Sequence, residues 1–252
     1  MIPKIIHYCW LSNDPIPQKL KECMETWKEK LPDYEFILWN FDRFDKNSSI
    51  WVQQAFDNKK YAFAADYIRL FAIYNYGAIY MDMDIEVLKD FESLLNQNLM
   101  IAYENPEKTG IEAGCFGSEK KNSFIEDCLG YYKDRAFIKN DGSFDILPLP
   151  KIMLKFLSAH QDVMPYDWHY FTNKSYHTGK ISTTEKSYSI HRFAGSWASA
   201  AQKKYDAYRK MFYSKFPKPL AKMLSFCAFI KWQITDNGFL GFCKKVLRRV
   251  KS

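Results

Sequence analysis

The chain has 252 residues, of which 17% are aromatic, and a formal net charge of +7. This length suits one α/β domain with a small appendage. The six cysteines form no Cys-x-x-Cys pair and no apolar run reaches the ~20 residues that cross a bilayer, which disfavours a disulfide framework, a zinc site and a membrane-spanning helix.

The charge of the chain is distributed unevenly. Residues 203–252 hold 13 Lys and Arg against two acids, so this segment carries +11 and the preceding residues carry −4. A basic end favours an anionic partner, either lipid head groups or nucleic acid, whereas the acidic body disfavours nucleic acid. The first residues lack the basic start and apolar stretch of a signal peptide, and we therefore expect a cytoplasmic protein.

The opening of the chain predicts a strand, a helix and a second strand at residues 2–10, 18–30 and 34–39. This order is a βαβ unit and favours a parallel sheet. Ser48 or Ser49 then caps the next helix.

Residues 61–88 carry the most informative pattern in the chain. Residues 61–76 contain no Gly or Pro and are rich in Ala, Leu, Ile and aromatic residues, which predicts a mostly buried helix that Gly77 ends. Residues 78–81 are a short apolar run without alternation, which is typical of a strand covered on both faces.

Asp82 and Asp84 follow this strand directly. If the backbone stays extended, side chains two residues apart point the same way, and open α/β sheets bind ligands beyond the carboxyl ends of their strands. Two carboxylates there repel each other unless a cation lies beside them. A divalent metal ion fits this position, because it binds carboxylate oxygens and the oxygens of a diphosphate at the same time. The alternative is a pair of solvated acids in a loop; the preceding helix, glycine and buried strand favour the site.

The rest of the body predicts strands at residues 85–88, 99–103 and 188–191 and helices at residues 123–133 and 150–160. Between them, two glycines in residues 111–117 suggest a segment whose backbone approaches a ligand closely.

The last segment predicts a separate appendage, with domains at residues 1–212 and 213–252. Apolar and basic residues mix from residue 215 onward, as in one or two amphipathic helices broken near residues 236–238. Such helices either lie on an anionic membrane leaflet or pack on the domain with a solvated basic face.

Four motifs in chain order, within about residues 1–200, together resemble glycosyltransferase family 32. They are Ile2-Pro3-Lys4-Ile5-Ile6-His7 with Trp10, Ala65-Asp66-Tyr67-x-Arg69, Gly77-Ala78-Ile79-Tyr80-Met81-Asp82-Met83-Asp84, and His191 with Gly195-Ser196-Trp197. The family comprises DXD sugar transferases, among them bacterial capsule and surface-polysaccharide enzymes, with the clostridial glucosylating toxins as more distant relatives. The resemblance implies a GT-A fold, which is a Rossmann-like mixed, mainly parallel sheet flanked by helices.

The resemblance also implies a nucleotide-sugar donor, a Mn²⁺ or Mg²⁺ ion and retention of anomeric configuration. In the family pattern Asp84 ligates the metal and Asp82 contacts ribose or sugar hydroxyls. His191 is either a second metal ligand or a hydrogen-bonded structural residue, and imidazole is an acceptable Mn²⁺ ligand.

The remaining expected site residues would bind the donor. Asp66 and Arg69 are three residues apart and share a helix face among apolar neighbours, which predicts a partly buried pair. The resemblance implies that this pair binds the donor sugar and its phosphate, and that Asp66, Arg69, Asp82 and Asp84 together form the catalytic group. It also implies that Trp10 stacks on the nucleobase and that Ser196 and Trp197 contact the diphosphate. Core packing is the alternative role for Trp10 and Trp197.

The sequence therefore predicts a metal-dependent retaining hexosyltransferase, with a UDP-sugar favoured over GDP-mannose. The acceptor would be a glycan or a lipid-linked molecule in surface polysaccharide synthesis, at the inner face of the cell membrane. Two alternatives remain. One is a nucleotidyl- or phosphotransferase with the same acidic pair, which the lack of a glycine-rich phosphate loop disfavours. The other is a non-catalytic protein that binds a sugar nucleotide or an anionic surface.

Overall fold

The chain folds into two compact units. The computed structural model describes residues 1–196 and 198–250. The first unit comprises Met1–Lys174 and Ile181–Ala194, and the second comprises Ser175–Lys180 and Gly195–Ser252. The expected domains, residues 1–212 and 213–252, stay a prediction.

A five-stranded mixed sheet forms the centre of the first unit. Its strands, in spatial order, are β2 (Glu35–Trp39), β1 (Ile5–Cys9), β3 (Ala78–Met81), β6 (Cys115–Ser118) and β5 (Leu99–Met100). The strands β2, β1 and β3 are parallel, as the βαβ opening predicts. However, β6 runs antiparallel to both β3 and β5. The sheet is less parallel than expected because β5 and β6 are joined without a helical crossover, and parallel neighbours need one.

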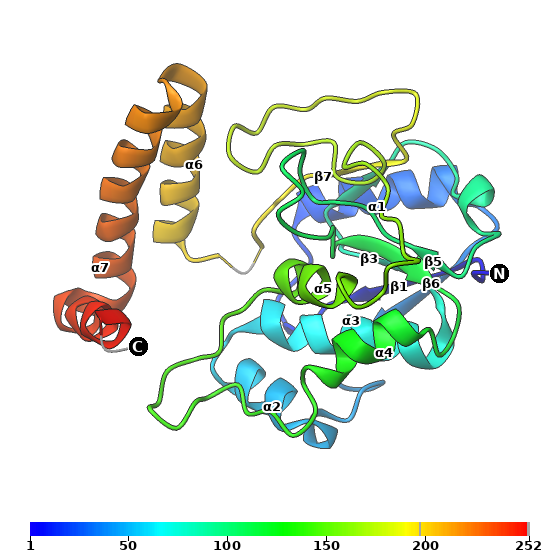
Figure 1. The fold of residues 1–252 in the computed structure, drawn as a ribbon, viewed down its shortest axis with the longest axis horizontal. Coiled ribbons are helices and arrows are strands. Elements are labelled where there is room, and N and C mark those ends of the chain that lie inside the picture. The colour runs from blue at the N-terminus through cyan, green and yellow to red at the C-terminus, as the bar shows by residue number, and fades with distance from the viewer. Residues whose placement is uncertain (197, 251–252) are drawn as a thin grey trace. The chain divides into compact units, whose positions relative to one another are not determined.

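Helices cover both faces of this sheet (Figure 1). On one face lies α1 (Gln18–Lys30), which shares a core with Ile79 and Met81 of β3. On the other lie α2 (Ile50–Asp57), α3 (Tyr61–Tyr76), α4 (Ser123–Gly130) and α5 (Leu149–Leu157). Tyr80 points into the core on that second side. Alternate residues of β3 thus enter two different cores, and the predicted two-sided burial of this strand is confirmed.

The helix α3 leads directly into β3. Its bounds, Tyr61–Tyr76, are those that the sequence predicts, and Gly77 follows with φ 72°. The Gly77 N–H donates to the carbonyl of Ile73 at 2.8 Å, which closes the last turn. A Cβ at Gly77 would lie 2.8 Å from the backbone N of Lys120, so the position requires glycine for space as well as for its φ.

A two-stranded antiparallel sheet lies beyond the end of β3. It pairs β4 (Ile85–Val87) with β7 (Ser189–His191), and Ile85 is opposite His191. The Trp27 indole of α1 donates to the Ile85 carbonyl at 2.6 Å and so connects this sheet to the core on the α1 side of the five-stranded sheet. Two short 3₁₀ helices, η1 (Lys46–Ser48) and η2 (Glu92–Leu94), complete the unit, and the Ser49 hydroxyl caps α2 as predicted.

The second unit is built on two helices, α6 (Ala200–Lys215) and α7 (Lys218–Val250). Gly238 has φ 70° and interrupts α7, so the predicted break near residues 236–238 is confirmed. Among the described residues, no helix is both long and apolar enough to cross a bilayer.

Candidate metal and donor site

The acidic pair lies in a turn at the carboxyl end of β3. The Ile85 N–H donates to the Asp82 carbonyl at 3.0 Å, so the backbone leaves the extended conformation at this point. The condition of an extended backbone, under which the two carboxylates would point the same way, is therefore not met. The turn, together with the return of the chain at β7, brings them together instead.

Asp82 is held by two donors from the protein. Its Oδ2 lies 3.2 Å from Arg69 Nη1, and its Oδ1 accepts a hydrogen bond from the Tyr80 hydroxyl at 2.9 Å. Burial raises the pKa of the Asp82 carboxyl, and the Arg69 charge opposes this shift. The side chain remains 23% exposed, so it can still meet a ligand.

Arg69 is the buried cation on the α3 side of the site, with 5% of its surface exposed. Besides Asp82, its guanidinium donates to the Ala113 carbonyl at 2.6 Å and lies 3.4 Å from Asp66. The Asp66 carboxylate also accepts the backbone N–H of Leu149, at the start of α5, and burial raises the pKa of Asp66 to about 6. The predicted burial of the Asp66–Arg69 pair is confirmed.

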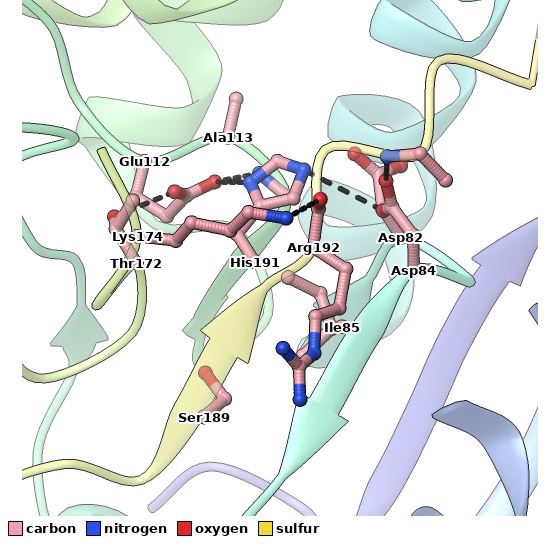
Figure 2. A network of polar contacts seen from close by, with 12 residues as sticks. Asp82, Asp84, Ile85, Glu112, Ala113, Thr172, Lys174, Ser189, His191 and Arg192 are labelled. Carbon is pink, nitrogen blue, oxygen red and sulfur yellow. Dashed lines mark hydrogen bonds and ion pairs between the residues drawn. The ribbon is translucent and has the colours of Figure 1, made fainter. Parts of the chain in front are cut away.

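Asp84 faces the segment that follows β7. Its Oδ2 accepts the Ala194 N–H at 2.7 Å, and its Oδ1 lies 3.5 Å from His191 Nε2 (Figure 2). Burial alone would raise the pKa of Asp84, but the charge of His191 and these hydrogen bonds outweigh burial and lower the pKa. Asp84 is thus an ionised, 14% exposed carboxylate beside an imidazole.

His191 lies between two carboxylates, as Figure 2 shows. Its Nδ1 is 2.9 Å from Glu112 Oε1, on the side of the ring away from Asp84. Burial disfavours the charged ring, yet Glu112 and Asp84 together raise the pKa of His191 well above its usual value. The ring of Phe193 stacks on the imidazole at 4.0 Å between centroids, so the ring plane is fixed as well.

Glu112 is the residue that sequence reasoning missed. It is 2% exposed and accepts three hydrogen bonds, from His191, from the Gly114 N–H at 2.7 Å and from the Thr172 hydroxyl at 2.6 Å. Burial would raise its pKa, but His191 and these donors lower it. The one signal in the sequence is a charged residue inside the otherwise apolar and glycine-containing residues 111–117.

Gly114 lets the backbone pass against this cluster. A Cβ there would lie 2.8 Å from His191 Cε1, 2.9 Å from Glu112 Oε1 and 3.1 Å from Asp82 Oδ2. The Gly114 carbonyl also accepts the Asp82 N–H at 2.7 Å. The segment approaches the acidic cluster closely in the structure, and its predicted approach to a ligand stays a prediction.

Three of these side chains could hold a metal ion. One ligand atom each from Asp82, Asp84 and His191 lies within 4.8 Å of the other two. Two carboxylates and one imidazole suit Mn²⁺, and carboxylate oxygens also suit Mg²⁺. The donor set therefore fits the ion that the DXD pattern implies.

The other expected donor residues are not brought into this cluster by any described contact. Trp10 follows β1 and is half-buried, and its indole donates to the Asp14 carbonyl at 3.0 Å. Ser196 belongs to the second unit, and Trp197 lies outside the described residues. The roles of these three residues stay predictions.

A protein-family model matches residues 17–101, and its description is "Glycosyltransferase sugar-binding region containing DXD motif". The match contains Asp66, Arg69, Asp82 and Asp84, whereas Trp10 and His191 lie outside it.

Curated relatives match about half of the chain. Inositol phosphoceramide mannosyltransferase 3 of Schizosaccharomyces pombe is 31% identical over 49% of this chain and 35% of its own length. Mannosyl phosphorylinositol ceramide synthase SUR1 of Saccharomyces cerevisiae is 32% identical over 51% of this chain and 34% of its own. The chain thus spans about a third of the length of the curated relatives it matches.

Two solved glycosyltransferase structures are also similar. The PaToxG glycosyltransferase is 20% identical over 63% of this chain and 69% of its own, with a TM-score of 0.49. The apo form of GlyE from Streptococcus pneumoniae TIGR4 is 13% identical over 65% of this chain and 44% of its own, with a TM-score of 0.38. Residues 17–101, which hold the acidic pair and the buried Asp66–Arg69 pair, are thus similar to the glycosyltransferase sugar-binding regions that contain a DXD motif.

Proposed function

We propose that the chain is a metal-dependent retaining glycosyltransferase of the GT-A type, which transfers a hexose from a nucleotide sugar. The observation that carries the proposal is the cluster of Asp82, Asp84 and His191 at the end of β3, inside or beside the matched sugar-binding region. The GT-A assignment and the retention of configuration rest on the family resemblance.

Asp84 and His191 are the proposed metal ligands. Asp84 Oδ1 and His191 Nε2 face each other at 3.5 Å, while the far side of each group is already bonded, to Ala194 N–H and to Glu112. The ion would act as a Lewis acid that stabilises charge on the departing nucleoside diphosphate. Glu112 fixes the His191 tautomer with Nδ1–H toward itself, which leaves Nε2 for the metal.

Asp82, Arg69 and Asp66 are the proposed donor-binding group. Both oxygens of Asp82 have protein donors, which makes Asp82 a weaker candidate for direct metal ligation than Asp84. Arg69 is held by Asp66 and by the Ala113 carbonyl, so its guanidinium is positioned before a donor binds. A pre-positioned cation can stabilise charge that develops during transfer without reorganising. Outside this cluster, Trp10 would stack on the base, and Ser196 and Trp197 would contact the diphosphate.

The proposed donor and acceptor rest on the sequence and on the names of the curated relatives. The sequence favours a UDP-sugar, whereas the names of the curated relatives specify a mannosyl group and thereby favour GDP-mannose. Those names also specify a phosphoinositol ceramide, which is a lipid. We propose a lipid-linked or glycan acceptor, in the synthesis of a surface polysaccharide such as a capsule.

A donor panel tests this function. The protein is incubated with several UDP-sugars and GDP-mannose plus Mn²⁺, and the released nucleoside diphosphate is measured. We expect turnover of one donor, and loss of that turnover with a chelator and in Asp84→Asn. The exposed acid Asp42 offers a matched control, since Asp42→Asn should turn over the donor normally. If no donor is turned over and none binds by calorimetry, the proposal is wrong.

A further inference from the structure

In the part of α7 whose side chains the structure describes, apolar side chains lie on two opposite faces, and α6 covers only one of them. On the covered face Phe229 and Trp232 pack against Tyr205 of α6, with ring centroids 6.0 and 5.2 Å apart. Ala221 and Ser225 lie on the same face and are 0% and 6% exposed. This face accounts for the packing of α7 within the second unit.

The opposite face is apolar and exposed. Leu220, Met223 and Phe226 are 39%, 57% and 61% exposed, and Cys227 is exposed beside them. Their spacing of three and four residues places them along one side of the helix. We call these four residues the α7 stripe. A run of large exposed apolar side chains is costly in water, and such runs mark interaction surfaces.

Lysines border the α7 stripe on both sides. At 100° per residue, Lys222 lies on one flank and Lys231 on the other, and both are exposed. Residues 207–235 contain six Lys and Arg and no Asp or Glu. A partner that is both apolar and anionic would complement this face.

We propose that the α7 stripe inserts into the interfacial region of an anionic membrane while the bordering lysines contact lipid phosphates. A helix of this kind lies in the plane of the interface, with its apolar side chains at the level of the acyl chains. Long lysine side chains reach the head groups from the edges of such a stripe. Anionic lipids add an attraction that salt screens.

Membrane contact of this unit would explain how an enzyme without a spanning helix among its described residues reaches a lipid-linked acceptor. This purpose rests on the proposed function, but the contact itself depends only on the second unit. The two can therefore be tested separately.

The test is sedimentation of the full chain with vesicles of phosphatidylcholine, with and without phosphatidylglycerol. We expect binding to the anionic vesicles only, and weaker binding in high salt. Changing Met223 and Phe226 together to Ser should lower the partition coefficient at least about tenfold, since two large apolar side chains no longer insert. Changing Lys222 and Lys231 together to Gln should lower it about tenfold on anionic vesicles.

Two variants serve as controls. Met164 of the first unit is 84% exposed and lies outside the α7 stripe, so Met164→Ser should bind vesicles normally. Asp84→Asn should also bind normally, which separates this proposal from the proposed activity. The proposal is overturned if the wild-type protein does not sediment, if the Met223 and Phe226 double variant sediments equally well, or if the protein binds a DNA duplex in preference to the vesicles.

Discussion

His191 Nδ1 lies 2.9 Å from Glu112 Oε1, so the imidazole that faces Asp84 is oriented by a second, fully buried carboxylate. Partners of this kind fix the ring of a metal-binding histidine and raise its basicity. Glu112 is in this sense a positioning residue, because its described contacts reach Asp84 only through His191.

Glu112→Gln should weaken Mn²⁺ binding by about 10- to 100-fold, because the amide keeps the shape of the side chain but loses its charge. Titration calorimetry of the protein with Mn²⁺ measures this change without any substrate. Glu119 is half-buried on the surface and provides the control, and Glu119→Gln should bind Mn²⁺ as the wild type does. Equal affinity in both variants would contradict the positioning role.

Gly114→Ala should also impair the site. The added Cβ would meet His191 and Glu112 at less than 3.0 Å, and the crowding should lower the free energy of unfolding by about 1 to 3 kcal/mol. We expect weaker Mn²⁺ binding as well, because the contacted groups must move. Gly130, at the end of α4, has no atom within 4 Å of its added Cβ, so Gly130→Ala should leave both quantities nearly unchanged. Urea unfolding and calorimetry compare the two variants, and an equal response would refute the crowding argument.

Arg69→Met should destabilise the fold by about 3 to 5 kcal/mol, because it leaves buried carboxylates without their cation. Asp66 and Asp82 both lie against this guanidinium. Urea unfolding in the presence of a chelator measures the loss. Lys28 is paired with Glu25 on the surface, and Lys28→Met should cost less than about 0.5 kcal/mol. A loss below about 1 kcal/mol for Arg69→Met would show that the cation is dispensable.

The stability of the first unit should fall in mild acid because of His7. This residue of β1 is 1% exposed, accepts a hydrogen bond from the Trp39 indole, and has a pKa that burial lowers to about 4. An unfolded histidine titrates near 6.5, so the unfolded chain takes up the proton first as the pH falls. The contribution of neutral His7 to the free energy of unfolding is complete above about pH 6.5 and is lost toward pH 4. We expect the free energy of unfolding to fall by about 2 kcal/mol by about pH 5.

Urea unfolding at several pH values measures this dependence. In His7→Gln the part of the pH dependence that comes from His7 should vanish, leaving a shallower fall over the same range. An unchanged slope would mean that His7 does not titrate as a buried neutral base.

The helices and strands that local signals define could be predicted from the sequence. The bounds of α1 and α3 match the prediction, since prolines flank one helix and Gly77 ends the other. The antiparallel β6 could not be predicted, because its direction depends on pairing across the sheet rather than on its own residues.

The candidate site was also predictable only where local sequence context marks its residues. Asp66, Arg69, Asp82 and Asp84 lie within one continuous segment, and their sequence context marks them. In contrast, Glu112 meets His191 across 79 residues and Thr172 across 60, and no local pattern encodes either contact. A spacing of two residues also fits a turn and an extended strand equally well, so the turn at Asp82 had no signal.

The hydrogen bond from Ala194 to Asp84 sets a limit on how far the protein can be shortened. Ala194 is the last residue of the first unit, and it contributes a backbone N–H rather than a side chain, so no point substitution other than proline removes this donor. A chain cut after Phe193 would lose the donor, whereas one cut after Gly195 would keep it. A fragment that keeps this bond to Asp84 therefore extends at least three residues beyond the last strand of the first unit.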